Sequence, residues 1–502
     1  MFTFGRGVLG RGVLGAIVLA AVAAPTAAAG PAPGTPEYLQ RDAQNMNDAY
    51  GRITGPGGQI QNPNYLPALM VEQNEVVANQ LLEQAATPTR LAITPGNVFP
   101  GWNAGNPLRR GWDGKRGQIV RISYTNRYGA LIRGDVFAPL PGARDPYTGA
   151  ALKPPYPGVV ITTGSVQGSE RMYWWLAQDL AERGYVVMTY DVQGQGTSET
   201  LPHPTNALPF CNPFAAPDDE ELSGCPGVPF QQEANFTKGT EDALDFFLST
   251  PSSPYVSPAS DDLDVNDYNP YWQLFDRSAD KRTVTPGRTT RVAIVGHSLG
   301  AAAVSKVQGT DSRVEAVVAL DKLSGPGSTG PLSGDGVVPK VPALAVQSEY
   351  GFTVQPYFLN GGNSLNPTPA SPLERPDPMR ERKTGFDAWR KAGVDSMLVV
   401  PRASTHLEYT DIPYVLPASR YGQDLASVYV QNWLGRYMKH QSSAPLLSTS
   451  LKYLEPTAVG QWTPVTLDRA ARLSFYYCSA YGFHDDRGRV VSSGDVAGVG
   501  GC

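Results

Sequence analysis

Apolar residues recur first at the spacing of helices and then at the spacing of strands along the chain. Apolar residues at 37–50 and 67–85 recur at helical spacing, so both segments are predicted to be helices. Near residue 118 the pattern changes to the alternation of strands. Residues 118–124 and 131–137 flank a Tyr-Gly turn at 128–129, which predicts an antiparallel hairpin. The chain is therefore expected to begin with helices that precede a sheet.

Beyond this hairpin, short apolar strands alternate with helical patterns. Such alternation is typical of a doubly wound, mostly parallel sheet, because a helix usually forms the crossover between parallel strands. We predict an α/β fold with a sheet of about eight strands and helices on both faces. The predicted strands are 158–162, 185–190, 291–295, 314–320, 341–346 and 396–400, and the predicted helices are 171–183, 236–248, 301–307, 384–391 and 424–440.

Composition suggests how the chain is divided. Two segments rich in Pro, Asn and Asp follow strands whose carboxyl ends would line a site, so they are assigned to its rim or to a lid. No period of 20 to 50 residues recurs, which argues against a repeat protein. The predicted parts are a signal peptide at 1–29, a helical lead-in at 30–115, an α/β domain at 116–441 with rim or lid insertions at 192–235 and 250–290, and a small C-terminal extension at 442–502.

The N-terminus has the order of a secretory signal peptide. Arg6 and Arg11 precede an apolar stretch over 12–24, and small residues follow at 25–29. The stretch is short for a membrane span and does not recur, so we expect a secreted protein with no stable membrane span after signal removal. The net charge of −5 and the absence of a long basic run argue against a nucleic-acid partner.

Four cysteines in an exported chain favour disulfides over free thiols. Of the three pairings, spacing favours Cys211 with Cys225 and Cys478 with Cys502. A metal site is the rival interpretation, but no CxxC and no nearby pair of histidines supports it, so no metal is predicted. The acidic run at 261–267 departs from a calcium-binding loop and is interpreted as solvated.

One segment carries the pattern of a nucleophilic serine. Ser298 lies in Gly-His-Ser-Leu-Gly, between the apolar strand at 291–295 and an alanine-rich helix. A sharp turn from strand to helix exposes such a hydroxyl, and Gly296 and Gly300 leave room for the two arms to pack closely. Ser298 is therefore the candidate nucleophile.

A serine hydroxyl needs a base to accept its proton, and imidazole has a suitable pKa. The chain has five histidines. His406 follows the last predicted strand of the sheet and precedes the last long helix, so it is the candidate base. His297 lies within the turn, where the side chain before the serine is normally directed away from the hydroxyl.

Three motifs together resemble the α/β-hydrolase superfamily over about residues 118–440. They are Asp-x-x-Gly-x-Gly-x-Ser at 191–198, Gly-His-Ser-Leu-Gly at 296–300, and Thr405 with His406. The last strands and the loop before His406 are also similar to bacterial cutinase-like polyester hydrolases and to dienelactone-hydrolase-type esterases. The resemblance implies an α/β-hydrolase fold and a secreted esterase or lipase that uses a Ser-His-acid triad.

Two carboxylates are candidates for the acid that orients His406. Glu349 follows the strand at 341–346, the usual location of the acid in this fold, whereas Asp321 ends the strand at 314–320, a position that some related lipases use. We favour Glu349 and keep Asp321 as the alternative. In the cutinase-like relatives the acid is an Asp.

The oxyanion of an acyl-transfer intermediate needs two N–H donors. The backbone N–H of Leu299, directly after the nucleophile, is one candidate. The second should come from the loop after the strand at 158–162, where we choose Ser165, with Val166 as the alternative. Tyr350 and Phe352 are candidates for the lining of an acyl pocket.

These residues predict hydrolysis of carboxylic esters through an acyl-enzyme, with no cofactor. The substrate could be a small molecule, a lipid or a polymeric ester, and the oligomeric state stays open. A secreted serine peptidase and an acyltransferase are the alternatives on the same fold. An alternative of another class is a catalytically idle binding protein.

Overall fold

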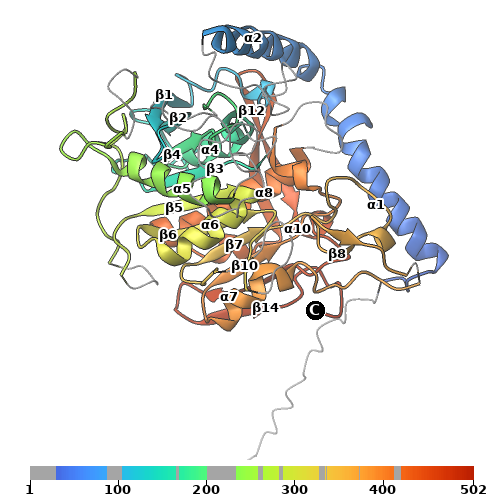
Figure 1. The fold of residues 1–502 in the computed structure, drawn as a ribbon. Coiled ribbons are helices and arrows are strands. Elements are labelled where there is room, and N and C mark those ends of the chain that lie inside the picture. Colours follow the sequence, from blue (N-terminus) through green and yellow to red (C-terminus); the bar gives the residue numbers. More distant parts are fainter. Residues whose placement is uncertain are drawn as a thin grey trace, which may run out of the picture.

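A ten-stranded sheet forms the centre of the described chain, with strand order β1-β2-β4-β3-β5-β6-β7-β10-β13-β14 (Figure 1). The structure is a computed structural model. It describes residues 30–86, 104–165, 169–199, 233–257, 264–281, 287–326, 334, 336–371, 373–411 and 420–502.

Eight of the ten strands of the main sheet agree closely with the predicted ones, whereas β13 and β14 were not predicted. The ten strands are β1 Gly117–Thr125, β2 Leu131–Pro139, β3 Gly158–Thr162, β4 Val186–Tyr190, β5 Val292–His297, β6 Val314–Leu320, β7 Ala343–Val346, β10 Ser396–Val399, β13 Ala480–His484 and β14 Val490–Ser493. Two further hairpins are formed by β8 Gly361–Gly362 with β9 Pro367–Thr368, and by β11 Ser450–Ala458 with β12 Gln461–Asp468.

Helices flank the sheet and connect its strands. They are α1 Pro36–Thr54, α2 Tyr65–Ala86, α4 Trp174–Glu182, α5 Glu233–Leu248, α6 Leu299–Thr310, α7 Asp387–Lys391, α8 Arg420–Lys439, α9 Ala444–Leu447 and α10 Arg469–Arg472. Short turns of 3-10 helix cover Gln59–Gln61, Pro107–Arg109, Glu170–Tyr173, Tyr357–Leu359 and His406–Tyr409, and one π-helical turn covers Arg382–Phe386.

The six strands from β4 to β10 in the sheet order are parallel, whereas β1 and β2 form an antiparallel hairpin that joins β4 at the edge. The predicted α/β fold class with a mostly parallel sheet is confirmed. The sheet has ten strands rather than about eight, because β13 and β14 add to β10 in antiparallel order.

Both faces of the sheet are buried, which explains why its strands are almost wholly apolar. In β5, Val292 and Ile294 pack with α5 and α6 on one face, whereas Ala293 and Val295 pack with α4 and α8 on the other. In Figure 1, α5 and α6 lie on the near face. This sandwich holds the carboxyl end of β5 rigidly, and Ser298 follows directly.

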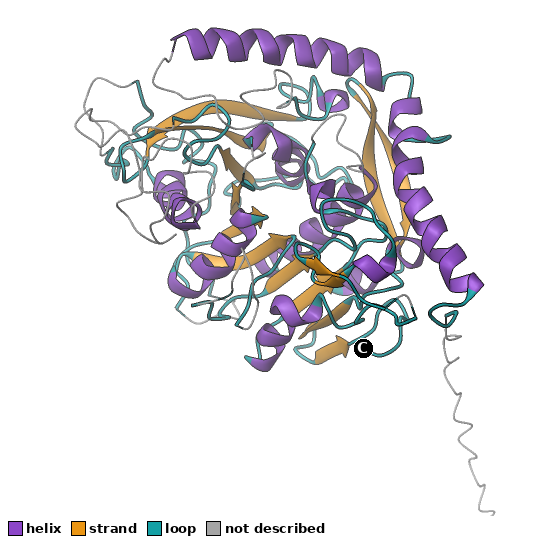
Figure 2. Ribbon diagram, turned by 45° about the vertical axis from the view of Figure 1, so that its right-hand side comes forward, coloured by secondary structure: helices purple, strands orange, loops and turns teal. Residues whose placement is uncertain are grey.

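The helices α1 and α2 lie on the outside of the molecule in both views (Figures 1 and 2). The buried residues of α1 recur on one face, and they include two polar residues, Asp42 and Asn45. Asp42 accepts hydrogen bonds from the Tyr357 N–H and the Tyr476 hydroxyl. The N-terminal segment is thus attached to the main body by buried polar contacts.

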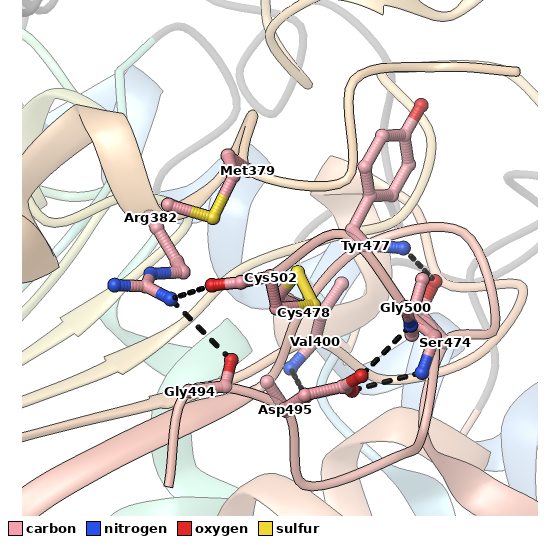
Figure 3. Close-up of a disulfide and its surroundings, with 12 residues drawn as sticks. Met379, Arg382, Val400, Ser474, Tyr477, Cys478, Gly494, Asp495, Gly500 and Cys502 are labelled. Atoms are coloured by element: carbon pink, nitrogen blue, oxygen red, sulfur yellow. Dashed lines mark hydrogen bonds between the residues drawn. A yellow bond between two sulfur atoms is a disulfide. The ribbon is translucent and has the colours of Figure 1, made fainter. Parts of the chain in front are cut away.

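The C-terminal residues are built into the main sheet rather than appended to it. The expected small extension at 442–502 contributes β13, which pairs with β10, and β14 behind it. A disulfide joins Cys478 to Cys502, as the spacing predicted, and Arg382 donates a hydrogen bond to the Cys502 carbonyl (Figure 3). The last residue of the chain is therefore fixed beside this edge of the sheet.

Some predictions fall outside the described residues. These are the signal peptide at 1–29, the Cys211 with Cys225 pair, and most of the insertion at 192–235. The remaining domain boundaries stay predictions. Among the described residues, no helix is long and apolar enough to cross a membrane.

Removal of the disulfide should destabilise the protein. The double substitution Cys478→Ala and Cys502→Ala opens a crosslink with a sequence separation of 24 residues. Because the crosslink restricts the unfolded chain, the free energy of unfolding should fall by about 3 kcal/mol in urea titrations. Cys478→Ala alone should have nearly the same effect. Unfolding midpoints equal to that of the unmodified protein would contradict a stabilising role.

Candidate active site

The turn at Ser298 has the backbone geometry of a nucleophile elbow. Ser298 lies between β5 and α6 with φ 55° and ψ −122°, a conformation that costs a non-glycine residue about 1–3 kcal/mol. A Cβ added to Gly296 would lie 2.1 Å from the Gly300 carbonyl oxygen, and one added to Gly300 would lie 2.4 Å from the Thr163 carbonyl oxygen. Only glycine therefore fits at either position.

The elbow is anchored to the neighbouring strand. The Ser298 N–H donates a hydrogen bond of 3.1 Å to the carbonyl oxygen of Leu320, the last residue of β6. Asp321 follows Leu320 directly, so the elbow and this carboxylate share one edge of the sheet. Ser298 is only partly buried, and the Leu299 N–H belongs to the first turn of α6, where backbone donors have no acceptor within the helix.

His406 contacts the carboxylate of Asp321. Its Nδ1 lies 2.8 Å from Asp321 Oδ2, and both side chains are almost completely buried. Asp321 also accepts hydrogen bonds from the Ser348 N–H and hydroxyl and from the Ser364 hydroxyl. Burial alone would raise the pKa of Asp321, but the hydrogen bond and charge of His406 and the bonds from Ser348 outweigh it and lower the pKa to about 2.

Glu349, the carboxylate favoured from the sequence, does not contact His406. Its Oε2 accepts hydrogen bonds of 2.6 Å from Asn45 Nδ2 and of 2.6 Å from the Ala403 N–H, and Oε1 accepts one from the Ser474 hydroxyl. The preference for Glu349 as the partner of His406 is therefore wrong in geometry, and the alternative, Asp321, occupies that place. The reason is that the side chain of Glu349 is directed toward α1.

Glu349 instead fixes the loop that carries His406. Ala403 has φ 54°, an unfavourable value for alanine, and its N–H is held by Glu349. Asn45 Oδ1 also accepts a hydrogen bond from Arg402 Nε, so α1 contacts this loop directly as well as through Glu349. Burial raises the pKa of Glu349, an effect that its hydrogen bonds to Ser474 and Asn45 oppose.

The loop after β3 lies directly beside the nucleophile. A Cβ added to Gly164 would lie 3.1 Å from Ser298 Cβ, and Ser165, the predicted second oxyanion donor, follows it. Ser165 is half-buried, whereas its alternative, Val166, lies outside the described residues. The structure thus brings Ser298, His406, Asp321 and the loop of Ser165 to one place.

Two aromatic residues border His406. The ring of Phe352 stands edge-on to the His406 ring with centroids 4.7 Å apart, and 51% of Phe352 is exposed. The ring of His297 lies 4.7 Å from the His406 ring on another side and is buried. Tyr350, the other candidate for the lining of an acyl pocket, is completely buried. Phe352 is therefore a half-exposed aromatic side chain directly beside His406.

Sequence reasoning missed Asn45 and Tyr173. Asn45 and Asp42 stand three residues apart on the otherwise apolar face of α1, and such buried polar positions are a signal of long-range hydrogen bonding. Tyr173 contacts both His297 and the loop of Gly164, and no sequence motif marks it.

Among the residues that the structure describes, no group of three or more His, Cys, Asp or Glu side chains could hold a metal ion. In the acidic run at 261–267, residues 264–267 are described. There the Asn266 side-chain oxygen accepts a hydrogen bond from the Ser123 N–H of β1, so this oxygen links the loop to the sheet.

The elbow glycines should not tolerate a methyl group. Gly296→Ala places a Cβ against the fixed Gly300 carbonyl, so we expect a loss of about 3 kcal/mol or more in the free energy of unfolding. Gly51→Ala is the matched control, because Gly51 lies in α1 with open space around its Cβ position. It should stabilise the protein by about 0.5–1 kcal/mol. Equal unfolding midpoints for the two variants would contradict the close approach.

Comparisons with known proteins do not show a family for this chain. No family model matches the chain, and no curated protein matches it. Among solved structures, a ferulic acid esterase from Streptomyces cinnamoneus matches at 16% identity and a TM-score of 0.34, over 65% of this chain and 90% of that one. This likeness is too distant to assign an activity, and the site stands on its own geometry.

Proposed function

We propose that the protein is a serine hydrolase that cleaves carboxylic esters, with Ser298 as nucleophile, His406 as base and Asp321 as the orienting acid. The observation that carries the proposal is the juxtaposition at one sheet edge of a strained serine and a buried histidine bonded through Nδ1 to a carboxylate. Nδ1–H donates to Asp321, which leaves Nε2 to accept a proton. Asp321 thereby fixes the tautomer of His406 that a general base requires.

The reaction follows from these positions. Ser298 Oγ forms a bond to the ester carbonyl carbon while its proton moves to His406 Nε2, and the carbonyl electron pair moves to the oxygen. The intermediate collapses, the bond to the alkoxy oxygen breaks, and His406 returns the proton to the leaving alcohol. Water then attacks the acyl-serine with the same proton transfers, and the carboxylic acid leaves as the Ser298 Oγ–carbon bond breaks.

The developing oxyanion needs preorganised donors. The Leu299 N–H at the start of α6 is one, favoured by the positive end of the helix dipole. The Ser165 N–H, in the loop beside Ser298, is the other. Asp321 remains ionised through the cycle and stabilises the imidazolium that forms on His406.

We infer that the protein acts outside the cytoplasm. The charged, apolar and small-residue order at the N-terminus supports secretion, and the disulfide between Cys478 and Cys502 fits an oxidising compartment. The half-exposed Phe352 beside His406 favours a substrate with an apolar group next to the ester. A panel of esters graded by acyl length, with a polyester film, would define the substrate further.

Ser298→Ala should abolish ester cleavage. Turnover of a short-chain nitrophenyl ester should fall by about 10³-fold or more, because the covalent route is lost. A fluorophosphonate should label the unmodified protein at Ser298 and leave the variant unlabelled. Ser312→Ala is the matched control, since Ser312 is exposed in the turn before β6, at the opposite end of that strand from Leu320. Equal turnover in the Ser298 variant, or turnover of amide but not ester substrates, would contradict the proposal.

Substitutions of Asp321 and Glu349 should have different effects on kcat and on stability. Asp321→Asn should lower kcat by about 10⁴-fold, since an amide favours the wrong tautomer of His406. Glu349→Gln should lower kcat by less than about tenfold but reduce the free energy of unfolding by about 1–3 kcal/mol, because buried charge-assisted bonds weaken. Both parameters can be measured on the same preparations. A larger loss of kcat in the Glu349 variant would reverse the assignment.

A further inference from the structure

The Gly164 residue beside Ser298 is held on both sides. Its N–H donates a hydrogen bond of 2.9 Å to the Tyr173 hydroxyl, and its carbonyl oxygen accepts one of 2.9 Å from Gln195 Nε2. Both side chains are buried, with exposed fractions of 1% or less. Because the Gly164 N–H is already bonded, the next donor along the loop is the Ser165 N–H.

The hydrogen bond from Gln195 also sets the direction of that donor. The Gly164 carbonyl and the Ser165 N–H belong to one planar peptide unit, in which they point in opposite directions when the bond is trans. By holding the carbonyl oxygen, Gln195 fixes the plane of this peptide and thus the direction of the Ser165 N–H. Gln195 Nε2 also donates a hydrogen bond of 3.3 Å to Thr163 Oγ1, which lies in the same loop.

His297 extends this arrangement to the base. Its Nδ1 lies 2.7 Å from the Tyr173 hydroxyl and its Nε2 lies 2.9 Å from the carbonyl oxygen of His406. A carbonyl oxygen only accepts, so Nε2 carries the proton and Nδ1 accepts from the Tyr173 O–H. The Tyr173 oxygen in turn accepts from Gly164, so every donor has an acceptor.

These hydrogen-bond donors and acceptors require a neutral His297 ring. Its surroundings are the Tyr173 hydroxyl, the His406 and Tyr409 rings and, further away, Asp321. Burial and the neighbouring His406 lower the pKa of His297 to about 3, although the bond to the His406 carbonyl and the charge of Asp321 oppose this. The His297 ring is therefore neutral at neutral pH.

The two side chains that hold Gly164 come from segments that are themselves joined. Asp191 Oδ1 accepts a hydrogen bond from the Glu170 N–H, at the start of the turn that carries Tyr173. Asp191 Oδ2 accepts one from the Thr197 N–H, in the turn that carries Gln195. The Asp-x-x-Gly-x-Gly-x-Ser motif thus joins the two supports of the loop.

We propose that Gln195, Tyr173 and His297 are positioning residues that hold the Ser165 N–H, as oxyanion donor, in fixed register with the main chain of His406. The proposal rests on the function proposed above. None of the three side chains takes part in bond making. Their effect is to set the direction of the donor before the transition state forms, which is when such a donor contributes most.

Two variants test the support of the donor. Tyr173→Phe removes the bonds to Gly164 and His297, and Gln195→Met removes the bond to the Gly164 carbonyl at similar volume. Each should lower kcat for a nitrophenyl ester by about 10- to 100-fold while KM changes less than about threefold. Tyr185→Phe is the matched control. Tyr185 is a buried tyrosine at the opposite end of β4 from the site, and its hydroxyl has no hydrogen-bond partner among the residues that the structure describes. The control variant should leave kcat unchanged.

A transition-state analogue separates positioning from a general loss of structure. A trifluoromethyl ketone adds to Ser298 and places an oxyanion against the two donors, so its inhibition constant should rise by the same factor by which kcat/KM falls in each variant. The double variant Tyr173→Phe with His297→Gln should lose little more than the worse single variant, because the residues act as one chain. Far-ultraviolet circular dichroism and melting temperatures identify a variant that fails to fold, in which case Gln195→Met decides.

The outcomes distinguish failure of the positioning role from failure of the proposed function. If Ser298→Ala retains turnover, the proposed function fails. If Ser298→Ala is inactive but the folded Gln195 and Tyr173 variants keep kcat and analogue affinity within about twofold of the unmodified protein, only the positioning role is overturned. A rise in KM at unchanged kcat would likewise overturn it, since that pattern indicates lost ground-state binding.

Discussion

A buried carboxylate sets the organisation of the site. Asp321 is wholly excluded from solvent, and an isolated charge at such a position would cost several kcal/mol. It persists because His406, Ser348 and Ser364 all donate to it. These partners lie after β10, after β7 and after β8, so one anion gathers the ends of several segments at a single edge of the sheet. The position of the histidine follows from the need to satisfy Asp321.

Much of this arrangement could be predicted from local sequence. Strands buried on both faces are continuous apolar runs, so β3 and β6 were bounded correctly, and the sharp change of pattern at Ser298 marked the elbow. The acid could not be chosen in the same way. β6 and β7 are adjacent and parallel, and each is followed within three residues by a carboxylate at the same edge. The choice depends on the direction of the Glu349 side chain, whose partners Asn45, Ala403 and Ser474 are all distant from it in sequence; Asn45 precedes it by 304 residues.

The C-terminal strands show the same limit. β13 joins β10 by antiparallel pairing between segments about 80 residues apart, and no periodicity within 442–502 reports on that partner. What the sequence does contain is the cysteine spacing, which was sufficient to pair Cys478 with Cys502. This disulfide could thus be predicted from the sequence, whereas the non-local pairing of β13 with β10 could not.

The loop of His406 is held from two sides by groups that have no part in proton transfer. On one side Arg402 and Glu349 both contact Asn45 of α1, and Glu349 binds the N–H of Ala403, which has a positive φ. On the other side His297 binds the His406 carbonyl. Both contacts are made to or beside the main chain, so they fix the backbone of His406 without occupying Nε2 of its imidazole. In the reaction proposed above, the base accepts and returns a proton in each half-reaction. It requires this combination, since displacement of the ring between the two steps would separate it from the serine or from the leaving group.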